Sequence, residues 1–166
     1  LPDRLDLLAA AEAGRELHGR IVLASLERVT PLLVSPAGEL QVAMQLGRDP
    51  GGTYRLSGSI RGNLILQCQR CLEALPWPLD VEFRLGLVRS QEAAERLARG
   101  YEPLLVTAEP ACVADIVSDE VLLALPFAPV HEDPDECHGM YKDYQPSCDV
   151  QRENPFAVLA GLKQKQ

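Results

Sequence analysis

The sequence predicts an α+β domain with an antiparallel sheet of about four to six strands, a few packing helices and a Cys-x-x-Cys turn at a hairpin tip. Two long stretches alternate apolar and polar residues with a period of two, which is typical of strands that bury one face. The turn Cys68-Gln69-Arg70-Cys71 lies between them. Hydrophobic residues make up 46% of the 166 residues and aromatic residues only 5%, so we expect an aliphatic core.

The N-terminal part of the chain predicts a helix followed by strands. Residues 3–17 carry apolar side chains at near-helical spacing, although Gly14 weakens the end of this segment. Residues 21–29 are rich in branched side chains and predict a strand. A turn at 35–38 then leads into residues 40–46, which alternate as a strand does.

Two long strands follow, and they are the clearest elements of the sequence. Residues 54–67 place apolar side chains and glycines on one face and polar side chains on the other. Residues 77–87 repeat this pattern. We expect the two strands to form a hairpin with the cysteine turn at its tip.

The next part of the chain predicts two helices. Residues 90–99 form a short helix that Ser90 caps, and a loop containing prolines follows. Residues 115–125 form an amphipathic helix that turns Asp119 and Glu120 outward. These elements complete a domain over residues 1–130.

The rest of the chain divides into a loop and a short apolar segment. Residues 131–153 are polar and predict a flexible loop, whereas residues 154–166 predict a helix with Asn at its cap and Pro at its first position. Phe156, Leu159 and Lys163 of this helix are candidate binding residues. The segment is too apolar to remain free in water, so it either docks on the domain or binds a partner.

Charge is unevenly distributed along the chain. The net charge is −8, yet residues 1–99 carry 12 acidic and 12 basic side chains. Residues 100–138 carry nine acidic side chains and no Lys or Arg. Such a segment repels phosphate and suits a basic protein partner. The alternative is a solvated face that keeps the protein in solution.

Composition and cysteine usage indicate a reduced, cytoplasmic protein. No apolar run reaches the roughly 20 residues that cross a bilayer, and no stretch reads as a secretory leader. Five cysteines are an odd number, which argues against a closed set of disulfides. No P-loop, dinucleotide-binding glycine motif or nucleophile-elbow motif is present. These observations favour a protein that is not an enzyme.

Cys68 and Cys71 have the spacing of two ligands to one tetrahedral Zn²⁺. His131 and Cys137 can complete a Cys₃His structural zinc site, and His138 is a further candidate. The alternative is a turn in which reduced cysteines simply pack. A redox pair is a third interpretation, but such pairs open a helix, whereas this one follows a strand.

Four arginines are candidates for contact with phosphate. Arg55 and Arg61 share the polar face of one predicted strand, Arg84 lies on the polar face of the next, and Arg70 lies in the cysteine turn. Together they can form a cationic stripe on the sheet. The alternative is that they pair with neighbouring acids, namely Asp80, Glu82 and Glu73.

Taken together, the motifs resemble the YceD family, the large ribosomal RNA subunit accumulation proteins of bacteria, with relatives in plant organelles. The resemblance covers about residues 15–166 and depends on the combination of motifs, since no single piece suffices. The motifs are the Cys68-Gln69-Arg70-Cys71 turn, the segment Leu125-Pro126-Phe127-Ala128-Pro129-Val130-His131, Cys137, and the tail Asn154-Pro155-Phe156-Ala157-Val158-Leu159-Ala160-Gly161-Leu162-Lys163.

The resemblance implies a cytoplasmic, non-enzymatic factor that large-subunit (23S) ribosomal RNA needs for its accumulation, through synthesis, processing or stability. It implies as partner the precursor of that RNA, a basic ribosomal protein, or both, with no membrane and no small-molecule substrate. The alternative is a zinc-stabilised or thiol-redox Cys-x-x-Cys module unrelated to the ribosome. Carried over by position, the family's marked residues are Cys68, Arg70, Cys71, His131, Cys137 and the tail 154–163.

Overall fold

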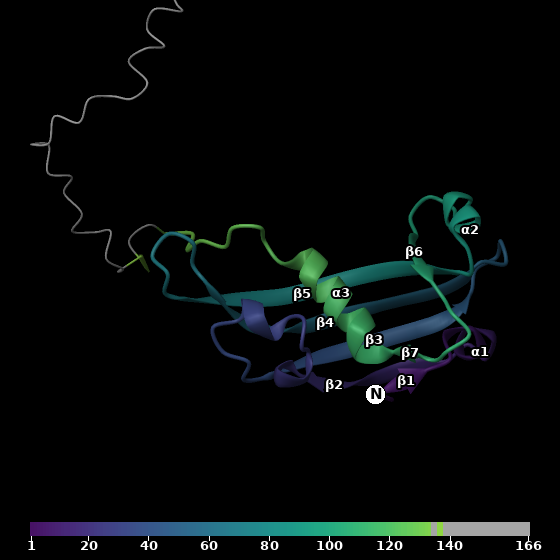
Figure 1. Cartoon of the computed structure of the whole chain (residues 1–166), viewed down its shortest axis with the longest axis horizontal. Coiled ribbons are helices and arrows are strands. Elements are labelled where there is room, and N and C mark those ends of the chain that lie inside the picture. Colours follow the sequence, from purple (N-terminus) through teal and green to yellow (C-terminus); the bar gives the residue numbers. More distant parts are fainter. Residues whose placement is uncertain (134–135, 138–166) are drawn as a thin grey trace, which may run out of the picture.

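The computed structural model describes residues 1–133 and 136–137 of the chain (Figure 1). Within this part, the strands are β1 (Arg4–Leu5), β2 (Glu16–Val22), β3 (Glu39–Arg48), β4 (Tyr54–Gln67), β5 (Ala74–Val88), β6 (Glu102–Leu105) and β7 (Ala111–Cys112). The helices are α1 (Leu7–Glu12), α2 (Gln91–Glu95) and α3 (Val113–Ala124), with two single-turn 3₁₀ helices, η1 (Leu23–Ser25) and η2 (Thr30–Leu32). This arrangement confirms the predicted α+β class.

The main sheet has five strands in the order β2-β3-β4-β5-β6. Neighbouring strands are antiparallel except β5 and β6, which run parallel. β4 and β5 pair from Gln67 opposite Ala74 to Arg55 opposite Gly86, so the expected long hairpin with the cysteine turn at its tip is confirmed. A separate two-stranded pairing joins β1 to β7.

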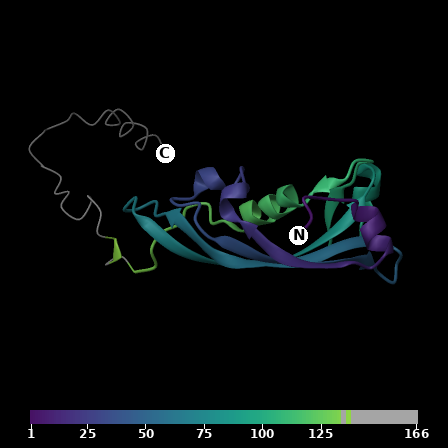
Figure 2. The same cartoon turned by 90° about the horizontal axis from the view of Figure 1, so that it is seen from below.

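One face of the sheet is covered and the other is open. α3 and the two 3₁₀ turns lie over the covered face (Figure 2). Leu56, Ile60 and Leu64 of β4 point toward this side and are fully buried, and the core around them is aliphatic, as expected. Strands that bury one face only must alternate, which explains the period of two in the sequence. In the described part of the chain, no helix covers the opposite face.

The predicted N-terminal helix over 3–17 is wrong in length, because it ends at Glu12. Gly14 adopts a left-handed conformation with φ of 61°, and its N–H and that of Arg15 donate to the carbonyls of Ala11 and Ala10. This is a Schellman motif, which ends a helix and reverses the chain. Residues 16–22 then form an edge strand of the sheet.

Three further expectations are corrected. The strand expected over 21–29 ends at Val22, and 3₁₀ turns follow it. The helix expected over 90–99 covers only Gln91–Glu95. Pro103, expected in a loop, lies in the edge strand β6, where a proline removes no hydrogen bond to a further strand.

Helix α3 forms where the amphipathic pattern predicts it. Its apolar positions Ile116, Val117 and Val121 face the core. Asp119 is exposed as expected, but Glu120 is buried, because β6 covers that side of the helix. No helix within the described residues combines the length and the apolar character that crossing a membrane requires.

Candidate functional site

The cysteine turn is closed by backbone hydrogen bonds at the tip of the hairpin. The N–H of Cys68 donates to the carbonyl of Glu73, and the N–H of Leu72 donates to the carbonyl of Cys68, both at 2.9 Å. The N–H of Gln69 donates to the carbonyl of Pro129 at 2.8 Å. This last bond fastens the segment that follows α3 to the turn, and so brings the residues after Pro129 close to the cysteines.

Four ligand side chains converge at this point, as the sequence predicts. Cys68, Cys71, His131 and Cys137 place their ligand atoms within 4.8 Å of one another. The Nδ1 of His131 lies 3.5 Å from the Sγ of Cys71 and 3.6 Å from the Sγ of Cys137. The two Sγ atoms of Cys68 and Cys137 are 4.0 Å apart. His138, the other candidate ligand, lies outside the described residues.

The cluster has the dimensions of a tetrahedral zinc site. Zn–S bonds of about 2.3 Å and Zn–N bonds of about 2.0 Å separate sulfur from nitrogen by roughly 3.6 Å and sulfur from sulfur by roughly 3.8 Å in a tetrahedron. The measured separations of 3.5, 3.6 and 4.0 Å agree with this geometry. Three cysteines and one histidine are also a donor set typical of structural zinc.

Opposing effects act on the thiols of the cluster. Burial of the Cys68 thiol raises its pKa, but hydrogen bonds from the backbone at Cys71, Arg70 and His131 outweigh burial and lower the pKa to about 5. Burial raises the pKa of the Cys137 thiol, and the neighbouring Cys71 and Cys68 raise it further. The Nη1 of Arg70 lies 3.8 Å from the Sγ of Cys137. Arg70 therefore contacts the cluster while its side chain remains exposed.

Arg55, Arg61 and Arg84 lie together on the open face of the sheet. The register places Arg84 opposite Ser57 and Arg61 opposite Asp80. Arg61 forms an ion pair with Asp80 at 2.9 Å, as the pairing alternative expected. Arg55 donates instead to the hydroxyl of Ser57. For Arg55 and Arg84, no ion pair occurs within the described residues.

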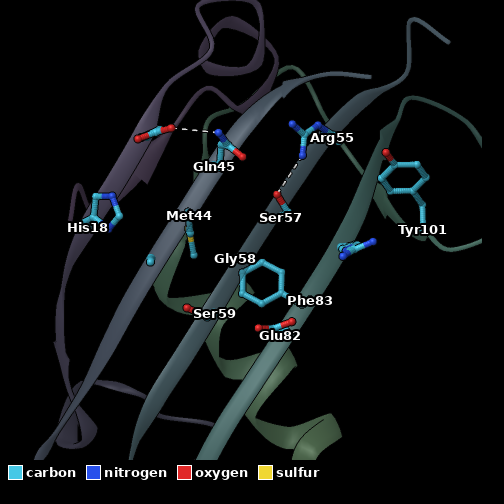
Figure 3. A pocket seen from close by; sticks show the side chains of 13 residues that line it. His18, Met44, Gln45, Arg55, Ser57, Gly58, Ser59, Glu82, Phe83 and Tyr101 are labelled. Carbon is cyan, nitrogen blue, oxygen red and sulfur yellow. Dashed lines mark hydrogen bonds between the residues drawn. The ribbon is translucent and has the colours of Figure 1, made fainter. Parts of the chain in front are cut away.

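An open depression of about 660 Å³, lined by Arg55 and Arg84 but not by Arg61, lies on the uncovered face (Figure 3). His18 of β2 and Tyr101, which precedes β6, stand at its two sides. Glu82 lies between them, so the depression carries both signs of charge. The sequence did not single out His18 or Tyr101, because His18 directly follows the helix predicted over residues 3–17 and Tyr101 falls in the loop predicted after residue 99. Correct placement of β2 would have found the histidine.

The sheet separates the arginines from the acidic helix. Asp115, Asp119 and Glu120 belong to α3, which covers the opposite face (Figure 2). The carboxylates of α3 therefore do not border the depression on the open face. A phosphate-bearing partner can reach Arg55 and Arg84 without passing over these carboxylates.

Comparison with known proteins identifies relatives. A family described as "Large ribosomal RNA subunit accumulation protein YceD" matches residues 56–163. A Haemophilus influenzae protein of the same description is 30% identical over 170 aligned residues, which cover 99% of this chain and 97% of that protein. No solved structure matches the chain. The matched range includes the cysteine turn, His131, Cys137 and the tail.

Proposed function

This chain belongs to the YceD family, and from that premise we propose that it supports the accumulation of large-subunit (23S) ribosomal RNA as a non-enzymatic factor that acts by binding. The family is named for this role, and its Haemophilus influenzae member carries the same name. Such a role takes place in the cytoplasm, where ribosomes are assembled. The proposal covers a role in the synthesis, the processing or the stability of the RNA.

The observation that carries the proposal is the pair of arginines without ion pairs on the open sheet face. Arg55 donates to the hydroxyl of Ser57 on the same strand, and Arg84 faces solvent from the adjacent strand. Cationic side chains on an uncovered sheet are suited to positioning an RNA backbone. Arg61 contributes less, because Asp80 neutralises it. Tyr101 adds one aromatic ring at the side of the depression.

The test is association with precursor RNA in cells. We expect the double variant R55A/R84A to recover much less large-subunit precursor RNA after crosslinking than the wild type does. In vitro, its binding to that RNA should show a salt dependence reduced by about two counterions. The control is R15A/R96A, which removes the same charge from exposed positions outside the sheet strands. Equal loss in both variants, or no enrichment of the RNA by the wild type, would contradict the proposal.

The cysteine cluster is the second part of the proposal, as a structural zinc site. Cys68, Cys71, His131 and Cys137 would hold the ion, which would supply a fixed crosslink between the hairpin tip and the segment after α3. Support comes from the tetrahedral separations and from the small size of the local core. Within the described residues, Leu75 is buried with the two cysteines, and the partly buried Trp77 and Cys137 pack against them. Arg70 would then balance the charge of Cys137 from outside.

Metal analysis of the purified protein tests the zinc site. We expect about one zinc per chain in the wild type, background zinc in C68S, and full zinc in the control C112S, since Cys112 lies at the start of α3 away from the cluster. A thiol-redox role is the alternative that the sequence leaves open. Zinc-free protein that forms and breaks a Cys68 disulfide reversibly would favour that role and contradict the zinc site.

The tail is the third part of the proposal, as a partner-binding segment. Phe156, Leu159 and Lys163 lie outside the described residues, so their role rests on the sequence pattern. An apolar segment with a terminal cation suits a groove on a ribosomal protein or on a particle that contains one. Its removal should weaken association with large-subunit precursors.

A further inference from the structure

A cavity of about 300 Å³ lies between α3 and β6, on the side of the sheet away from the arginines. Glu102 of β6 and Glu120 of α3 place carboxyl groups in it. Its apolar lining comes from both elements and from β5. The apolar side chains are Leu85, Pro103, Leu104, Ile116, Leu122 and Leu123.

Glu120 is the unusual residue of this cavity. It is only 7% exposed, and no hydrogen bond or ion pair to its side chain occurs within the described residues. Its carboxyl oxygens reach the solvent of the cavity, because no buried side-chain oxygen within the described residues lacks a hydrogen-bond partner. A carboxylate in such a largely enclosed position gains from a cationic partner. Burial raises the pKa of Glu120, and the nearby carboxylates of Glu102 and Asp119 raise it further. Among the described residues, Arg28 is the only cationic side chain that lines the cavity.

The cation is not supplied by this chain's own neighbours in the described region. Arg28 at the rim forms an ion pair with Asp119 and is thereby neutralised. Glu102 has no recorded ion pair in this part of the chain. Two carboxyl groups, Glu102 and Glu120, thus remain without a counter-charge.

The geometry also limits what the cation can be. Among the described residues, three or more metal-ligand side chains converge only at the cysteine cluster, so these carboxyls do not form a compact metal site. The walls are aliphatic, and Leu123 at the rim is 72% exposed. Aliphatic walls with carboxylates match a side chain that has a methylene stem and a cationic head.

We propose that this cavity receives a lysine or arginine side chain of a basic polypeptide partner. The head would meet Glu120 and Glu102, and the stem would lie against Leu104 and Leu123. This inference deepens the proposed function, because it names the chemical class of a protein partner and places that partner opposite the RNA-facing arginines. It identifies Glu120 as a specific binding residue of the acidic segment, in place of non-specific attraction by the net charge of the whole segment.

The test measures binding of a fluorescently labelled ten-residue oligolysine by anisotropy, in the absence of RNA. We expect E120Q to weaken binding at least about 10-fold, since it removes a charge partner that lies in a largely enclosed site. D115N is the matched control: it removes the same charge from an exposed position of α3 that does not line the cavity. We expect D115N to weaken binding less than about 2-fold.

A second probe tests the apolar stem. An oligomer of ornithine carries the same charge at neutral pH on a stem with one fewer methylene group. We expect the wild type to bind it more weakly than oligolysine, and we expect E120Q to bind the two oligomers equally. Equal weakening by E120Q and D115N, or equal affinity of the wild type for both oligomers, would overturn the proposal in favour of diffuse attraction. Because no RNA is present, such a failure would not bear on the proposed binding of RNA by Arg55 and Arg84.

Discussion

Leu72 adopts a left-handed backbone conformation, with φ of 65°, immediately after the second cysteine of the turn. This conformation costs a residue with a Cβ about 1–2 kcal/mol, and the Leu72 side chain is 55% exposed, so its burial offsets little of that cost. We expect L72G to raise the free energy of unfolding by about 0.5–1 kcal/mol.

Urea unfolding of the wild type and of L72G measures this effect. L72A is the control, because alanine keeps the Cβ and therefore the backbone penalty. A gain in L72A equal to that in L72G would show that the side chain, and not the backbone, is responsible.

Glu120 makes stability depend on pH in a predictable direction. Burial raises its pKa in the folded protein above the unfolded value, so ionisation is easier in the unfolded chain. The loss of folding stability that Glu120 causes is absent below its unfolded-state pKa and grows as the pH rises toward its folded-state pKa. We expect E120Q to be more stable than the wild type at neutral pH and to lose this advantage in acid.

Thermal unfolding of both proteins between acid and neutral pH measures the difference. D115N should follow the wild type across the same range, because Asp115 is exposed. A constant difference between E120Q and the wild type at every pH would rule out ionisation as its cause. If E120Q is more stable than the wild type and also binds oligolysine more weakly, Glu120 serves binding and not stability.

The residues of the cysteine–histidine cluster were predictable, whereas the glutamate cavity was not. Cysteine and histidine are few, and their chemistry narrows the choice, so Cys68, Cys71, His131 and Cys137 could be named from spacing and residue type. Glu120 follows Asp119 on the polar side of an amphipathic pattern, which predicts exposure. Its burial depends on β6, an element whose pairing is not local in the sequence.

Among the elements, β4 depends on glycine where it packs closely against its neighbours. A Cβ at Gly58 would lie 2.4 Å from the carbonyl oxygen of Ala43 and 2.5 Å from the Cζ of Phe83. We expect G58A to destabilise the protein by about 1–3 kcal/mol, because backbone and ring must move.

The control is G47A on β3, where a Cβ would meet nothing within 4 Å. It should change stability by no more than about 0.5 kcal/mol. Chemical denaturation of both variants, with the midpoint and slope compared, measures the contrast. Similar stability of G58A and G47A would mean that β3 and β5 can move away from β4 at residue 58 with little loss of stability.

The strands β3, β4 and β5 follow directly from alternation, because each is long and, apart from the buried residues 85–88 of β5, buries one face only. β6 escaped prediction for physical reasons: it has four residues, contains Pro103, and pairs in parallel with β5 at the edge of the sheet. None of these properties leaves a periodic pattern. The length of α1 was missed because apolar spacing continued past Gly14, where the backbone and not the pattern ends the helix.

For the whole molecule, the described residues form a hydrophobic core of their own. Its buried residues extend from Leu5 to Val121. We therefore expect deletion of residues 154–166 to change the melting temperature by less than about 3 °C, while association with large-subunit precursors falls. Truncation after Val130 is the informative contrast, because it also removes His131 and Cys137 and should abolish zinc binding. A collapse of thermal stability in the shorter deletion would show that the tail docks on this domain.

The pairing of β1 with β7 has a consequence for synthesis. Arg4 lies opposite Cys112, and the N–H of Val113 donates to the carbonyl of Asp3. A chain made from its N-terminus onward can close the β4–β5 hairpin soon after Val88 leaves the ribosome, because that pairing is local. The first strand must instead wait until residue 113 has emerged. The order of translation therefore makes the pairing of β1 with β7 one of the last contacts to form, after the sheet that it adjoins.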